Sequence, residues 1–73
     1  MKMFNSDLLR DKIKAAGFRI DYVADQLQIS YQAFWNKMNK KTEFTAAEIG
    51  ALKDLLHLSD ADVMLIFFTE KVD

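Results

Sequence analysis

Residues 17–38 read GFRIDYVADQLQISYQAFWNKM, and this stretch decides the fold of the 73-residue chain. Its apolar residues recur at three- and four-residue steps, a spacing that predicts short amphipathic helices. The first helix is expected over residues 20–27, with the small Ala24 on the face that packs against another helix. After a tight turn, Ser30 is a good N-cap for a second helix that extends to about Asn39. The sequence therefore predicts a helix-turn-helix unit over about residues 20–38.

Three more helices are expected outside this unit, so its two helices are the second and third of five when counted along the chain. The first lies near residues 6–16, capped by Asn5 or Ser6 and ended by Gly17. Two capping boxes, at residues 45–48 and 59–62, open a fourth helix and a fifth that runs from Asp60 to about Phe67. The residues expected on buried faces are Leu9, Ile13 and Ala16 in the first helix, Phe34 and Met38 in the third, and Ile49, Leu52 and Leu56 in the fourth.

Length and composition fit one domain over residues 1–73. With 51% hydrophobic and 29% charged residues and no proline, the chain is typical of a globular domain. We expect a compact, all-α, five-helix fold, with residues 68–73 as a C-terminal tail that is either a short strand or coil. The absence of cysteine excludes disulfides. No apolar run reaches the roughly 18 residues of a membrane span and no signal peptide is recognisable, so a cytoplasmic location without membrane contact is expected.

Charge is distributed unevenly along the chain although the net charge is only −1. The segment 31–42 holds three lysines and no acid, whereas residues 43–73 hold two lysines against seven acidic residues. A short basic strip on an otherwise neutral or acidic domain suits contact with a polyanion by one face only. A typical nucleic-acid-binding domain is more basic than this chain.

The stretch 17–38 resembles the Cro and repressor superfamily of phage and bacterial regulators, whose two short helices pack through a small residue at the position of Ala24. Residues 30–44, SYQAFWNKMNKKTEF, and the ending Ile66-Phe67-Phe68 are similar to small Cro-like or repressor-modulator proteins of phages of Gram-positive bacteria. The resemblance implies a lambda-repressor-like fold in a bacterial host cell. It also implies a sequence-specific transcriptional regulator that binds a double-stranded DNA operator and inserts the third helix into the major groove.

In this family, residues at the start of the third helix and one turn later contact base edges, which maps onto Tyr31, Gln32 and Asn36. Amides suit such a role because they donate and accept hydrogen bonds together at adenine. The alternative is that both amides are ordinary surface residues, and that the lysines belong to a solvated loop. The resemblance and the charge pattern assign the phosphate contacts to Arg19, Ser30, Lys37, Lys40, Lys41 and Thr42.

Two positions depart from the family pattern. Ile20 stands where the family often has a glutamine that contacts DNA, so that contact is absent. Gln28 stands where the turn usually holds glycine, so Gln28 is expected to adopt a left-handed conformation.

A different class of function is a protein-binding modulator of repression, or antirepressor, that uses the same fold to bind a partner repressor. Trp35 is either an anchor in such an interface or a core residue packed against the fourth helix. Phe67, Phe68 and Val72 either form a dimer seam or close the bottom of the helical bundle. The expected partners are therefore DNA, a second copy of the chain and, in the alternative, a phage repressor.

Catalysis is not expected. His57 is the only histidine, the carboxylates stand at helix starts, and a glycine-rich phosphate loop is lacking. The sequence thus predicts no enzyme, no metal site and no cofactor.

Overall fold

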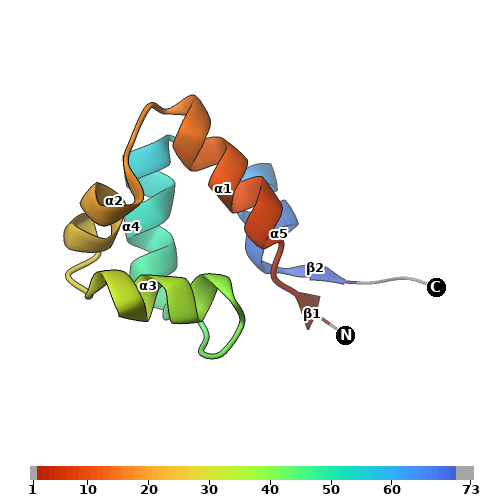
Figure 1. Cartoon of the computed structure of the whole chain (residues 1–73). Coiled ribbons are helices and arrows are strands. Elements are labelled where there is room, and N and C mark those ends of the chain that lie inside the picture. Colours follow the sequence, from red (N-terminus) through yellow and green to blue (C-terminus); the bar gives the residue numbers. More distant parts are fainter. Residues whose placement is uncertain (1, 71–73) are drawn as a thin grey trace.

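The computed structural model describes residues 2–70. The expected all-α, five-helix fold is confirmed for this part of the chain (Figure 1). No helix within it is long and apolar enough to cross a membrane. The helices are α1 (Ser6–Ala15), α2 (Ile20–Gln26), α3 (Tyr31–Met38), α4 (Ala46–Leu56) and α5 (Asp60–Phe67).

The two ends of the described chain meet in a small ribbon. Strand β1 (Lys2–Met3) pairs antiparallel with β2 (Thr69–Glu70), with Lys2 opposite Glu70. Of the two alternatives for the C-terminal tail, a short strand is therefore correct for Thr69–Glu70, whereas residues 71–73 lie outside the described part. The ribbon and both chain ends lie at the side of the molecule away from α2 (Figure 1).

The starts of four helices are fixed by the side chains that the sequence indicated. Asn5 Oδ1 accepts a hydrogen bond from Leu8 N at 3.0 Å, and Ser30 Oγ accepts one from Ala33 N at 3.0 Å. Both capping boxes are reciprocal, Thr45 with Glu48 and Ser59 with Asp62. These contacts satisfy backbone N–H groups that have no partner inside the helix, so each helix begins where it was predicted.

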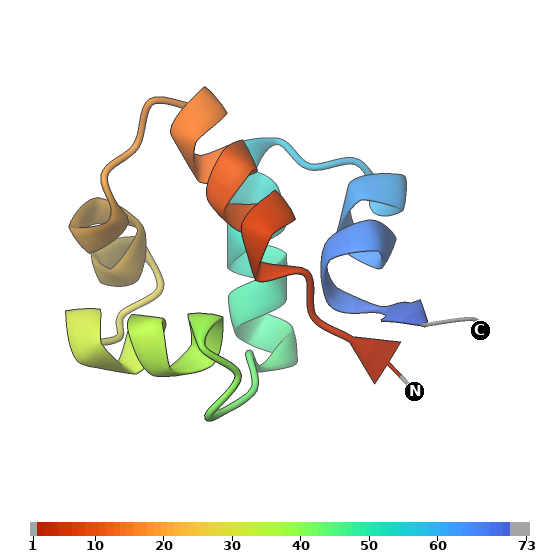
Figure 2. The same ribbon diagram turned by 45° about the vertical axis from the view of Figure 1, so that its right-hand side comes forward.

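The core lies between α1, α4 and α5 on one side and the α2–α3 pair on the other. Helix α1 packs beside α5, α2 packs on α3, and α3 runs crosswise beneath α4 (Figures 1 and 2). The completely or almost completely buried large side chains are Leu9, Ile13, Val23, Phe34, Leu52 and Ile66.

The predicted core was wrong at Ala16, which is exposed. Ala16 is the C-cap of α1, and the chain leaves the helix there through Gly17 at φ +79°. Ala16 therefore lies beyond Ile13, the last buried residue of α1. Ile49 and Leu56 are only half-buried, although they do pack against the buried cluster.

Three residues other than glycine have a positive φ within residues 2–70. Gln28 has φ 59°, as expected from its place in the helix-helix turn, and Lys40 and His57 have φ 66° and 54°. L-residues pay a steric penalty in this left-handed region, so each of these positions carries local strain.

Candidate nucleic-acid interface

The α2–turn–α3 unit is held by short backbone hydrogen bonds and by a buried face. In the turn, Gln28 N donates to Asp25 O at 2.9 Å and Ile29 N donates to Ala24 O at 3.1 Å. Ala24 itself is 2% exposed, which allows the two helices to approach closely. The unit lies at the opposite side of the molecule from the chain ends (Figure 2). Helix α3 is thus presented on a rigid support.

The outer face of α3 carries two amides that are bonded to each other. Phe34 and Met38 turn inward, at 0% and 2% exposure, so the opposite side of the helix is left to solvent. There, Gln32 Nε2 donates to Asn36 Oδ1 at 3.1 Å. The amide oxygen of Gln32 and one of its N–H groups remain available for a ligand. The two predicted base-contacting amides therefore form one unit.

Tyr31, the third predicted base contact, belongs to a small aromatic cluster at the start of α3. Its side chain is 55% exposed, and its ring lies 6.1 Å from that of Trp35 in an edge-on arrangement. The guanidinium of Arg10 in α1 lies 5.4 Å above the Trp35 ring, a cation–π distance. Trp35 also meets Phe34 edge-on at 6.1 Å. Trp35 is therefore a half-buried residue that links α3 to α1 and packs against the core.

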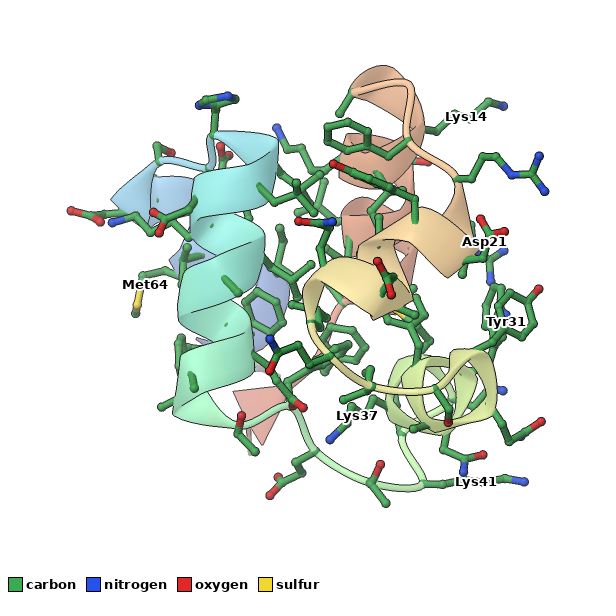
Figure 3. All side chains as sticks on the ribbon, turned by 90° about the vertical axis from the view of Figure 1, so that its left-hand side faces the viewer. Lys14, Asp21, Tyr31, Lys37, Lys41 and Met64 are labelled. Atoms are coloured by element: carbon green, nitrogen blue, oxygen red, sulfur yellow. The ribbon has the colours of Figure 1, made fainter. Side chains whose placement is uncertain are left out.

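The predicted phosphate-binding lysines separate into two groups. Lys40, Lys41 and the neighbouring Thr42 are exposed, and neither lysine forms an ion pair with any residue in the described range. Lys37 is different, because its ammonium lies 3.1 Å from Glu48 Oε1 and donates to the backbone oxygen of Glu43 at 3.0 Å. Its side chain is only 13% exposed. Figure 3 shows Lys37 turned toward the start of α4, while Lys41 points to the side shared with Tyr31.

The other two predicted phosphate contacts lie at the N-caps of α2 and α3. Arg19 is 85% exposed, and its Nε lies 3.3 Å from Asp21 Oδ1, so part of its charge is offset locally. Ser30 uses its hydroxyl oxygen as the cap of α3, which leaves the hydroxyl hydrogen free to be donated.

Lys14 is a further exposed cation that the sequence pattern did not indicate. It is exposed in the last turn of α1, and it points to the same side of the molecule as Tyr31 and Lys41 (Figure 3). The order of residues along the chain could not reveal this, because it depends on how α1 is placed relative to α2 and α3 in the fold (Figure 3). Asp21 lies on this side too, between the two elements (Figure 3).

The candidate protein-interface residues are also placed differently from one another. Phe67 is 9% exposed, and its ring stacks on Phe4 at 5.6 Å and meets Phe44 edge-on at 5.7 Å. Of the two alternatives for Phe67, closing the bundle is the one that the structure supports. Phe68 is 36% exposed. Val72 lies outside the described residues.

The residues gathered at α3 are amides, aromatic rings and exposed cations. In the described part of the chain, no three histidine or acidic side chains come together as a metal site would need. No protein-family model, curated protein or solved structure matches the chain.

Proposed function

We propose that the protein is a sequence-specific, double-stranded DNA-binding transcriptional regulator of the Cro and repressor type, with α3 as its recognition helix. The observation that carries the proposal is the outer face of α3, where Gln32 and Asn36 are joined by a 3.1 Å hydrogen bond and followed by two lysines without ion-pair partners in the described chain. A major groove about 12 Å wide admits one helix, and this face offers both base-reading and phosphate-binding groups.

Gln32 is the proposed base-reading residue, with Asn36 holding its amide in one orientation. The free oxygen and N–H of Gln32 match the N6 donor and the N7 acceptor of adenine, and such a bidentate contact contributes about 1–3 kcal/mol of discrimination. Tyr31, at the start of the same helix, is the proposed third contact, to either a base edge or a phosphate.

The proposed phosphate contacts surround this face. Lys40, Lys41 and Thr42 follow the end of α3, while Arg19 and Ser30 cap α2 and α3. Lys14 joins this group because it points to the same side of the molecule as Tyr31 and Lys41 (Figure 3). Lys37 does not, since its ammonium is already bound within the protein. Exposed cations without partners release counterions from DNA, which makes binding depend steeply on salt.

A second candidate function is the binding of a partner repressor by the same end of the molecule. The observation that favours it is the exposed Tyr31 ring beside Trp35 and Arg10, since tyrosine, tryptophan and arginine are the residues enriched in protein interfaces. The net charge of −1 also fits a protein partner better than a polyanion. A second copy of the chain remains a further proposed partner, because helix-turn-helix proteins commonly occupy two half-sites as dimers.

The test begins with a selection of duplexes from a random DNA library, followed by a salt titration of the best duplex. We expect the wild-type affinity to fall steeply with salt. Lys40→Gln and Lys41→Gln should each reduce the slope of log K against log salt by about 0.9, and should each lower the affinity about eightfold at 0.1 M salt.

Lys53→Gln is the matched control, because Lys53 undergoes the same change but pairs with Asp60 at 2.6 Å, away from α3. It should leave both the slope and the affinity unchanged. Gln32→Ala should remove the preference at one base pair without changing the slope. If no duplex is enriched, or if Lys53→Gln lowers the slope as much as Lys41→Gln, DNA binding by α3 is refuted. Loss of a repressor complex in Tyr31→Ala would then support the second candidate.

A further inference from the structure

Among the cations that form ion pairs in the described chain, Lys37 has the least exposed side chain. Its ammonium lies 3.1 Å from the carboxylate of Glu48, donates to the backbone oxygen of Glu43 at 3.0 Å, and lies 5.9 Å from the centre of the Phe44 ring, a cation–π distance. The Lys37 and Glu48 side chains are both 13% exposed. An ammonium has only three N–H donors, so few of them remain for an outside ligand. The contacts therefore serve the protein itself.

These contacts connect the two ends of the loop that carries the exposed lysines. At the first end, Lys40 N donates to Lys37 O at 3.1 Å and Lys41 N donates to Asn36 O at 2.8 Å, which ties the loop to the last turn of α3. At the second end, the Lys37 side chain holds Glu43 O and, through Glu48, the capping box that opens α4. The loop is therefore anchored by backbone bonds at its first end and by the Lys37 side chain at its second.

The middle of this loop is held by backbone hydrogen bonds to the end of α3, which include a longer one from Thr42 N to Asn36 O at 3.4 Å. Lys40 is held at φ 66°, a strained conformation for a residue with a side chain, and Lys41 and Thr42 are exposed. Figure 3 shows Lys41 and Lys37 pointing to different sides of the loop backbone. The direction in which Lys40 and Lys41 point thus depends on these backbone bonds at one end of the loop and on the Lys37 side-chain contacts at the other.

We propose that Lys37 is a positioning residue of the DNA interface: by joining Glu48 and the Glu43 carbonyl, it fixes the loop so that Lys40 and Lys41 face the phosphate backbone, without contacting DNA itself. The proposal rests on the proposed function. A loosened loop still lets both lysines reach phosphates, so the number of released counterions stays the same. What changes is the entropy lost when the loop becomes ordered on binding.

The test compares Lys37→Met, Glu48→Gln and their double mutant in the salt titration described above. Lys37→Met keeps an unbranched side chain, one atom shorter, and removes the charge. Glu48→Gln keeps an amide oxygen for Thr45 N, so the cap of α4 and the fold are preserved. We expect each single variant to lower the affinity roughly three- to tenfold, with the salt slope within about 0.3 of wild type. The double mutant should bind about as well as Lys37→Met alone, because both changes remove the same ion pair between Lys37 and Glu48.

Lys41→Met is the matched control, and it should lower the slope by about 0.9. The positioning role is overturned if Lys37→Met lowers the slope by a similar amount, if it leaves the affinity unchanged, or if its effect simply adds to that of Glu48→Gln.

A second measurement tests the loop without DNA. Amide hydrogen exchange at Lys41, whose N–H is bonded to Asn36 O, should be about tenfold faster in Lys37→Met than in wild type, while exchange in α2 stays unchanged. If the wild type binds no DNA but exchange is faster, the proposed function fails and the anchoring by Lys37 stands. If exchange at Lys41 is unchanged, the anchoring itself is refuted.

Discussion

The turn between α2 and α3 offers a sharp test of the fold, because glutamine occurs both in it and just before it. Gln28 sits at φ 59°, whereas Gln26 is the last residue of α2 with a helical backbone. Both side chains are exposed, and neither makes a side-chain hydrogen bond or ion pair within the described chain. Replacing either residue by glycine therefore changes little besides the backbone preference.

The two replacements should change the free energy of unfolding in opposite directions. A left-handed residue with a side chain costs roughly 1–2 kcal/mol, which glycine avoids, but glycine gains about 0.5–1 kcal/mol more conformational entropy in the unfolded chain. Gln28→Gly should therefore stabilise the protein by about 0.5–1 kcal/mol. Gln26→Gly, in a helical conformation, keeps only the unfavourable contribution and should destabilise it by roughly 0.5–1 kcal/mol.

Urea unfolding followed by circular dichroism measures both effects. For a chain of this size, with a slope near 1 kcal/mol per molar urea, Gln28→Gly should raise the midpoint by about 0.5–1 M and Gln26→Gly should lower it by a similar amount. The melting temperature should shift by about 4–8 °C for each kcal/mol. If Gln28→Gly lowers the midpoint, or if both variants shift it in the same direction, the left-handed geometry of the turn is refuted.

Two further predictions concern acid and the core. Burial opposes ionisation of Glu48, but hydrogen bonds from Thr45 and Lys37 outweigh it and lower its pKa; the Lys53 ammonium lowers the pKa of Asp60 in the same direction. The ionised forms are therefore favoured by folding, and their contribution is present above about pH 4.5 and lost as the pH falls through the lowered values. Urea midpoints measured from pH 7 to pH 3 should fall on acidification, and less steeply in Glu48→Gln; an equally steep fall in that variant would contradict the assignment. Phe34→Ala, which removes a ring at 0% exposure, should cost about 3–5 kcal/mol, whereas Tyr31→Ala on the same helix should cost less than about 1 kcal/mol; thermal melts that fail to separate the two would contradict the placement of the core.

The features that could be predicted from the sequence are those that depend on near neighbours along the chain. A capping box needs a hydroxyl and a carboxylate three residues apart, so residues 45–48 and 59–62 predicted the starts of α4 and α5 correctly. The inward faces of α3 followed from helical periodicity in the same way. Gln28 was expected in a left-handed conformation because the resemblance identified its place in the turn.

Other features depend on contacts that the local pattern does not contain. Lys40 and His57 adopt a positive φ, although neither is glycine or asparagine, the residues that would have predicted it. The pairing of β1 with β2 joins the two ends of the described chain and follows from how α1 packs beside α5. That Lys14 points to the same side of the molecule as Tyr31 and Lys41 likewise requires the tertiary arrangement (Figure 3).

The charge of the candidate DNA interface shows why counting along the chain was insufficient. Lys37, Lys40 and Lys41 form an uninterrupted basic strip in the sequence, and the absence of an acid between them suggested three phosphate contacts. The acid that matters comes after the loop, because Glu48, in the first turn of α4, returns to within 3.1 Å of the Lys37 ammonium. The ion pair with Glu48 thus removes the charge of Lys37 from the surface that DNA would meet. The same contact holds the loop, so what appears as a lost phosphate contact is, in the proposed interface, the reason that the other two lysines have a fixed direction.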